Sequence, residues 1–281
     1  MKPIRLQTEY MTNPMGISIT SPRLFWNVEG GKAQTAYQLE AYDDKGNLLL
    51  NTGKVLSSSM HYDWQGKPVD WCTRVNWKVR VYDENGQISD FAEAFFETGL
   101  PEGQNWEARW ISGNYKVNRK VRYPVDCFRK EFEINDVRKA RLYITACGLY
   151  EASINGKKAG DFIMAPGITD YNKRIQYQTY DITEMLKKKS LVEVEVGPGW
   201  MSGSIARIAE GYQITPPIAI IGDIDITYED GTEEKIETDE TWMTKKSSVF
   251  YTDIYHGETI DARFTDKKGV PAKLPNGAKR F

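Results

Sequence analysis

Residues 75–82 read Val-Asn-Trp-Lys-Val-Arg-Val-Tyr, a run in which apolar and polar residues alternate. Successive side chains of an extended strand point to opposite faces of a sheet, so this spacing predicts a β-strand with one buried face. Trp77 stands between Val75 and Val79 on the apolar face. We therefore predict that Trp77 lies in a core and that the fold is built from such strands.

Turn signals separate this run from similar ones. They are Asp43-Asp-Lys-Gly46, Asp83-Glu-Asn-Gly86 and Glu229-Asp-Gly231. The last two contain Asn-Gly and Asp-Gly pairs, which accept positive φ in tight hairpins. The sequence thus predicts a mostly antiparallel, all-β protein. Residues 182–189 form the best helical candidate, one or two turns long, with Asp181 or Thr183 as the cap and lysines at its end.

The length of 281 residues suggests two domains. Pro101-Glu-Gly-Gln-Asn-Trp-Glu107 interrupts the strand pattern with turn-forming and polar residues, which predicts a linker over 101–110. Residues 1–100 suit a seven-stranded β-sandwich, and residues 111–264 suit a larger one. Residues 265–281 are basic and polar, with little apolar surface to bury, so they are predicted to form an extended or disordered tail.

Composition argues against several classes of function. The chain carries 37 Lys and Arg against 39 Asp and Glu, so no overall field favours nucleic acid or acidic membranes. No apolar run approaches the ~20 residues that span a bilayer, and the N-terminus lacks an apolar signal core. Three widely spaced cysteines and two histidines predict neither a disulfide framework, nor a metal site, nor a Ser-His-Asp triad. Cys147 is predicted to be a small buried thiol.

A series of short motifs extends from residue 5 to residue 263. They are Arg5-Leu-Gln-Thr-Glu-Tyr10, Asn13-Pro-Met-Gly16, Ser21-Pro-Arg-Leu-Phe-Trp26, Gln34-Thr-Ala-Tyr37, Trp77-Lys-Val-Arg80, Phe96-Glu-Thr-Gly99, Arg141-Leu-Tyr-Ile-Thr-Ala146, Gly148-Leu-Tyr150, Asn155-Gly156, Ala165-Pro-Gly-Ile-Thr-Asp-Tyr171, Tyr177-Gln-Thr-Tyr-Asp-Ile-Thr183, Gly199-Trp-Met-Ser-Gly203 and Gly257-Glu-Thr-Ile-Asp-Ala-Arg263. In this order they resemble the N-terminal region of bacterial α-L-rhamnosidases of glycoside hydrolase family 78.

The resemblance implies a fibronectin type III-like or immunoglobulin-like module followed by a jelly-roll module. It also implies that the catalytic residues of these inverting glycosidases lie in an α/α barrel that follows this region. No segment of the chain corresponds to that barrel. We therefore expect no catalytic residues here, and we expect the chain alone to be inactive.

Acidic residues are plentiful, and glycoside hydrolysis uses a pair of carboxyl groups. Asp223 and Asp225 alternate with isoleucines, which predicts that they project from the solvent face of a strand. The acidic group over 229–234 is predicted to be solvated at a hairpin tip. Glu258 and Asp261 fall inside a family motif with Arg263, and a structural ion pair with Arg263 is the expected role.

Sugar binding needs aromatic faces and planar polar groups. The candidates in the second module are Trp200, Tyr171, Tyr150 and Tyr212, with Asp170, Asn155, Asn172 and Arg174. The alternative is that the aromatic residues belong to the core and that Asn155-Gly156 is a hairpin turn. In the first module, Trp26, Trp64 and Trp71 are open to either role.

Some modules that resemble this one bind L-rhamnose with the help of calcium. The residues before Trp200, Gly197-Pro-Gly199, offer no side-chain ligand, which leaves only backbone carbonyls for a calcium ion. We accordingly predict no metal, with calcium as the alternative.

The expected function is to bind or position a rhamnose-containing glycan, or to dock on a catalytic barrel. The alternatives are a stand-alone lectin-like protein and a structural spacer without a ligand. An exposed pair of coplanar aromatic rings would favour the lectin, and a bare apolar patch would favour docking. A periplasmic or extracellular location is expected, and the missing signal core keeps a cytoplasmic one open.

Overall fold

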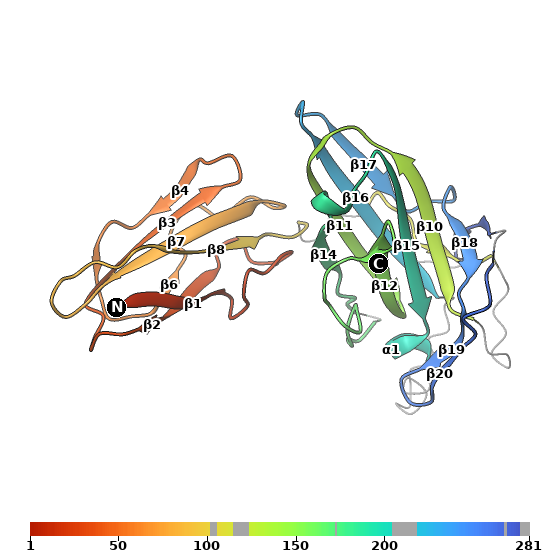
Figure 1. Cartoon of the computed structure of the whole chain (residues 1–281), viewed down its shortest axis with the longest axis horizontal. Helices are drawn as coiled ribbons and strands as arrows, with labels where there is room; N and C mark the ends of the chain where they lie inside the picture. The colour runs from red at the N-terminus through yellow and green to blue at the C-terminus, as the bar shows by residue number, and fades with distance from the viewer. Residues whose placement is uncertain (102–105, 115–123, 172, 204–217, 267–268, 276–281) are drawn as a thin grey trace. The chain divides into compact units, whose positions relative to one another are not determined.

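The computed structural model describes residues 1–101, 106–114, 124–171, 173–203, 218–266 and 269–275. The chain is all-β, as predicted, and divides into two compact units, residues 1–104 and 105–281 (Figure 1). No helix in these ranges is long and apolar enough to cross a membrane. Cys72, Cys127 and Cys147 are free thiols, and Cys147 is buried, as predicted.

Unit 1 is a sandwich of two antiparallel sheets. One sheet has the order β1 (Lys2–Thr8), β2 (Arg23–Glu29), β6 (His61–Asp63); the other has the order β4 (Leu48–Asn51), β3 (Ala36–Asp43), β7 (Arg74–Tyr82), β8 (Ala92–Glu97), with β5 (Val55–Leu56) paired to β3. Among its described residues, unit 1 thus holds eight strands, one more than the seven expected.

The core of unit 1 contains the tryptophan that the alternation predicted. Trp77 is 1% exposed, between Val75 and Val79 on β7. Trp26 and Trp64 are also buried: Trp26 donates its indole N–H to Gln34 Oε1 at 3.0 Å, and Trp64 donates to the Lys67 carbonyl at 2.8 Å. These two side chains therefore belong to the core and cannot form a sugar platform.

Unit 2 is a larger sandwich whose two sheets enclose an apolar core. The six-stranded sheet has the order β13 (Lys157–Lys158), β12 (Leu149–Ile154), β15 (Lys189–Gly197), β10 (Asp126–Glu133), β18 (Met243–Lys246), β21 (Val270–Pro271). The five-stranded sheet has the order β14 (Gln178–Asp181), β11 (Val137–Cys147), β16 (Ala219–Tyr228), β17 (Glu233–Glu237), with β9 (Ile111–Ser112) paired to β16. A hairpin of β19 (Val249–Asp253) and β20 (Gly257–Ile260) lies beside α1 (Gly199–Ser202) at one end of the unit (Figure 1).

The helical prediction over 182–189 is confirmed only in part, because residues 186–188 are neither helix nor strand. Only a single 3-10 turn, η1 (Thr183–Met185), forms there, and β15 already begins at Lys189. Asp181 Oδ1 accepts hydrogen bonds from the backbone N–H of Thr183 at 3.1 Å and from its hydroxyl at 2.7 Å. This aspartate therefore shapes the turn that enters η1. The N-cap residue is nevertheless Ile182, without a side-chain capping hydrogen bond, so the predicted cap at Asp181 or Thr183 is wrong.

The predicted tail after residue 264 is wrong for its central part. Val270–Pro271 pairs with β18 as β21, Ala272 is 5% exposed, and its N–H donates to the Trp242 carbonyl at 2.8 Å. The N–H of Ser112 donates to the Lys273 carbonyl at 2.8 Å. Backbone hydrogen bonds to the edge of the sheet hold this segment in place. The prediction considered only apolar side chains, and backbone hydrogen bonds do not depend on them.

Candidate functional site

The end of unit 2 that carries α1 brings together three loops. Gly199, with φ of 48°, begins α1, and a Cβ atom there would lie 2.4 Å from Leu149 Cγ and 2.6 Å from Leu149 N. Only glycine therefore allows α1 to lie against the start of β12. A Cβ at Gly197 would similarly lie 2.5 Å from Thr252 Cγ2 of β19. The two glycines of Gly197-Pro-Gly199 thus serve close packing.

A small apolar cluster joins α1 to the loop before β14. It consists of Cys147, Tyr171, Met201 and Ala219, with Trp110, Ile175 and Trp200 packed against it. The loop over residues 160–177 is also tied to β12, because the N–H of Tyr150 donates to the Ala165 carbonyl at 3.0 Å. We call this region, formed by α1, residues 160–177 and the β19–β20 hairpin, the α1 end.

Two aromatic candidates for sugar binding lie in the interior. Tyr171 is 3% exposed, and its hydroxyl donates to the Gly167 carbonyl at 2.8 Å. Tyr150 is also buried, and its hydroxyl donates to Gln178 Oε1 at 2.7 Å. Burial raises the pKa of both phenols. The prediction that these rings contact sugar is therefore wrong, because both faces are already packed.

Asn155 has a structural role in place of the predicted one. It occupies the hairpin turn with φ of 52°, its Nδ2 donates to the Met185 carbonyl at 2.8 Å, and its Oδ1 accepts from Leu191 N–H at 3.0 Å. Its amide is thus committed to holding η1 and β15. Asn172 and Tyr212 lie outside the described residues.

The remaining sugar candidates, Trp200, Asp170 and Arg174, lie on two elements of the α1 end. Trp200 is half-buried against the apolar cluster, and its indole N–H is buried without a hydrogen-bond partner among the described residues. The Asp170 carbonyl accepts from the N–H of Lys173 at 2.8 Å and of Arg174 at 2.9 Å, which forms a tight turn. Asp170 is half-buried and Arg174 is exposed. The structure therefore groups Trp200 with this turn through the neighbouring side chains of the cluster.

The same end presents large apolar side chains to solvent. Phe162 is 48% exposed, Ile163 76%, Met164 42% and Ile168 67%. We call these four residues the apolar loop. The sequence analysis did not identify this loop, although its sequence contains a signal. Phe162-Ile-Met164 is an uninterrupted apolar run among turn-forming residues, and a run without alternation cannot place all of its side chains on one buried face. Tyr255 and Ile260 of the hairpin are exposed as well.

The carboxylates of the family motif make local contacts. Asp261 forms a two-point ion pair with Arg263, with Nε–Oδ1 of 2.9 Å and Nη2–Oδ2 of 3.0 Å, on the surface. This contact lowers the pKa of Asp261. Glu258 Oε1 accepts from the Thr252 hydroxyl at 2.9 Å. The arrangement is an ion pair with Arg263, and Glu258 takes no part in it.

The prediction that Asp223 projects into solvent is wrong, because the residue is only 3% exposed. Alternation along β16 does place it opposite the core, but the outer face of the five-stranded sheet is itself covered. Burial raises the pKa of Asp223 to about 7 and also raises that of Asp225. Across the described residues, no group of three or more His, Cys, Asp or Glu side chains could hold a metal ion.

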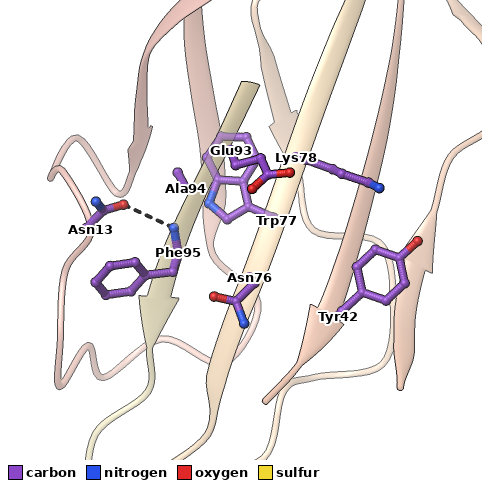
Figure 2. Close-up of a pocket in the computed structure, with 8 residues that line it drawn as sticks. All are labelled: Asn13, Tyr42, Asn76, Trp77, Lys78, Glu93, Ala94 and Phe95. Atoms are coloured by element: carbon purple, nitrogen blue, oxygen red, sulfur yellow. Dashed lines mark hydrogen bonds between the residues drawn. The ribbon is translucent and has the colours of Figure 1, made fainter. Parts of the chain in front are cut away.

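Unit 1 carries a shallow groove of about 380 Å³ on the outer side of β7 and β8 (Figure 2). Asn76 lies there between Tyr42 and Phe95, and Asn13 Oδ1 accepts from Phe95 N–H at 3.0 Å. The guanidinium carbon of Arg74 already stands 3.7 Å from the centre of the Phe95 ring. Because a cation occupies that ring face, the groove offers no open pair of aromatic platforms.

Comparison with known proteins identifies both units. Residues 3–102 match the family described as the Rha78A-like N-terminal immunoglobulin domain, and residues 135–269 match the α-L-rhamnosidase N-terminal domain. An α-L-rhamnosidase of Formosa agariphila is 33% identical over 91% of the chain, and one from Alteromonas sp. (strain LOR) is 31% identical over 94%. The chain covers 30% and 31% of these two relatives.

Solved structures agree with this assignment. The α-L-rhamnosidase of Dictyoglumus thermophilum has a TM-score of 0.81 and 32% identity over 98% of the chain, and that of Aspergillus terreus has 0.87 and 28% over 97%. The chain covers 34% of each. The chain therefore belongs to the α-L-rhamnosidases of glycoside hydrolase family 78 and corresponds to their N-terminal region.

Proposed function

We propose that this chain is a docking portion of an α-L-rhamnosidase, and that its α1 end binds the catalytic portion of that enzyme. The exposed apolar loop carries this proposal. Loops at the end of a sandwich are ordinarily polar, and a group of exposed apolar side chains on a folded surface marks an interaction site. Phe162, Ile163, Met164 and Ile168 provide such a group within seven residues.

The backbone of this loop is fixed although its side chains are exposed. Gly167 N–H donates to the Met164 carbonyl at 3.1 Å, and Gln178 Nε2 donates to the Pro166 carbonyl at 3.1 Å. The Tyr171 hydroxyl holds the Gly167 carbonyl from the inside. A surface that is already ordered loses little conformational entropy when it binds, which favours association.

The relatives supply the partner for this surface. They are α-L-rhamnosidases of which the chain covers about a third, so some two thirds of each relative lies outside the match. A catalytic portion in the same polypeptide would meet the α1 end at high effective concentration, and even a modest apolar contact would then hold it. The fixed loop therefore suits an interface within one enzyme.

The test mixes this chain with the part of the Formosa agariphila enzyme that lies outside the match and measures binding by calorimetry. The expected result is saturable binding that the double variant Ile163→Asp, Ile168→Asp weakens at least ~10-fold, because burying each isoleucine contributes roughly 1.5–3 kcal/mol. Leu56→Asp is the matched control. Leu56 is 81% exposed, but it belongs to unit 1, so its replacement should leave binding unchanged.

Two outcomes would count against docking on a catalytic portion. The first is the absence of binding by the unmodified chain. The second is self-association of the chain in sedimentation experiments that the double variant abolishes, which would assign the apolar loop to a second copy of this chain.

A second role, weak binding of a deoxy sugar such as L-rhamnose, is favoured by Trp200. Its buried indole N–H lacks a partner among the described residues, and the turn with Asp170 and Arg174 lies across the same cluster. An indole face can cover the methyl side of such a sugar, while a carboxylate and a guanidinium bond its hydroxyls. Few contacts are available, so roughly millimolar affinity is expected.

Titration with L-rhamnose, followed through backbone amide shifts, tests this role. Shifts are expected in residues 173–176 and 199–203, and Trp200→Ala should remove them. No shift at tens of millimolar sugar, or shifts confined to unit 1, would disprove the sugar site and leave the docking proposal untouched.

A further inference from the structure

The outer face of the five-stranded sheet in unit 2 carries a row of carboxyl groups. Asp223 and Asp225 of β16 stand on this face, opposite Glu237 and Lys235 of β17. On the other side they stand opposite Tyr143 and Arg141 of β11. Because these positions are directly paired, their side chains are neighbours on one face.

Residues 106–110, which we call the strap, run across this face. The Trp106 ring meets the Tyr177 ring edge-on, with 5.8 Å between the ring centres. The centre of the Tyr177 ring lies 6.4 Å from that of Tyr143 on β11. Arg109 N–H donates to the Thr238 carbonyl at 2.8 Å, and the Thr238 hydroxyl donates back to the Arg109 carbonyl at 2.7 Å. An ion pair between Arg109 Nη1 and Glu240 Oε1 at 3.5 Å and the packing of Trp110 on the apolar cluster also hold the strap beside the acidic row.

The charges under the strap are unbalanced. Burial raises the pKa of Glu237, and the neighbouring carboxyl of Glu107 on the strap raises it further. Lys235 Nζ lies 3.5 Å from Asp225 Oδ1 and is the cation that acts on both aspartates. Arg141 on β11 is already held by Asp181 of β14 at 2.8 Å. In the described residues, four carboxyls therefore face one available ammonium group.

Asp223 is the member of this row with the least compensation. It is 3% exposed, and its Oδ1 is fully buried without a hydrogen-bond partner among the described residues. A buried carboxylate without a partner costs several kcal/mol, whereas a protonated carboxyl avoids most of that cost. Desolvation is the largest cause of the raised Asp223 pKa, and the charges of Asp225, Glu237 and Glu107 raise it further.

We propose that Asp223 is a proton-binding site that controls the strap: residues 106–110 pack on the sheet when the Asp223 carboxyl holds a proton, and they detach when it ionises. Detachment removes the charge of Glu107 from the row and admits water to Asp223. The strap leads directly into β9, so the proton state sets how firmly the segment before β9 is anchored on unit 2.

Hydrogen exchange of the whole chain at pH 6 and pH 8, corrected for intrinsic exchange, tests this proposal. The Arg109 amide is expected to lose protection by roughly tenfold or more at the higher pH, about the effect of one pKa unit. In Asp223→Asn, which keeps the shape but cannot ionise, its protection should be equal at both values. Asp136→Asn, at an exposed position on the same unit, should behave like the unmodified chain.

A direct titration avoids any dependence on a variant. The carboxyl carbon resonance of Asp223 in the unmodified chain should change with a midpoint near pH 7. A midpoint near pH 4, protection of Arg109 that does not depend on pH, or a pH-dependent loss that persists in Asp223→Asn would each overturn the proposal.

Discussion

Lys246→Met is expected to lower the free energy of unfolding of unit 2 by about 3–5 kcal/mol. Lys246 Nζ lies 2.9 Å from Asp126 Oδ1, across the paired strands β18 and β10. The Asp126 side chain is 2% exposed, so loss of the ammonium group removes a cation 2.9 Å from a carboxylate in the interior. Urea denaturation of the whole chain, followed through the amides of β10 and β15, measures the change.

The matched control is Lys189→Met. Lys189 Nζ lies 3.1 Å from Glu133 Oε1, also between two paired strands, but both side chains are largely exposed at 82% and 69%. Such a surface pair contributes about 0–1 kcal/mol. Equal losses in the two variants would contradict the argument, because burial of the carboxylate is the physical difference between them. Addition of Asp126→Asn to Lys246→Met should restore part of the lost stability.

Asp223→Asn is expected to stabilise unit 2 at pH 8, by on the order of 2–4 kcal/mol for a shift of about three pKa units. The folded pKa is about 7, against 3.8 in the unfolded chain, so between these values the folded state binds more protons. Stability therefore falls as pH rises from about 4 to 7, and the penalty is complete above pH 7. The gain from the variant should vanish near pH 4.

Denaturation curves at pH 4.5, 6 and 8 measure this dependence. The unmodified chain should lose stability across the series relative to Asp223→Asn, while Asp136→Asn should follow the unmodified chain. An Asp223→Asn variant that is equally or less stable at pH 8 would show that the folded protein compensates the ionised carboxylate.

Local alternation predicts strands and their faces well. The run from Val75 to Tyr82 predicted both β7 and the burial of Trp77, because a strand repeats every two residues whatever surrounds it. The same rule placed Asp223 on the correct face of β16. It failed on exposure, because the cover over that face comes from residues 106–110, more than a hundred positions earlier in the chain.

The sugar site near Trp200 and the segment over residues 170–174 stays a prediction, and the structure places some of its candidate residues in the core. Trp200 shares one apolar cluster with Tyr171 and Ile175, and Tyr171 is buried in that cluster. Residue type alone cannot distinguish a core aromatic from a surface platform, since both bury large apolar faces. Asn155 illustrates the opposite case: its Asn-Gly pair indicated a hairpin, and the turn uses the amide completely.

The short strand β21 has a practical consequence for the limits of unit 2. The family match ends at residue 269, and the limit read from the sequence was 264, so both stop before Val270–Pro271. A chain cut at either point would leave the outer edge of β18 with unpaired N–H and C=O groups. Such an edge is a template for pairing with another molecule, so a shortened protein would be prone to aggregate although it retained every large apolar residue of the core.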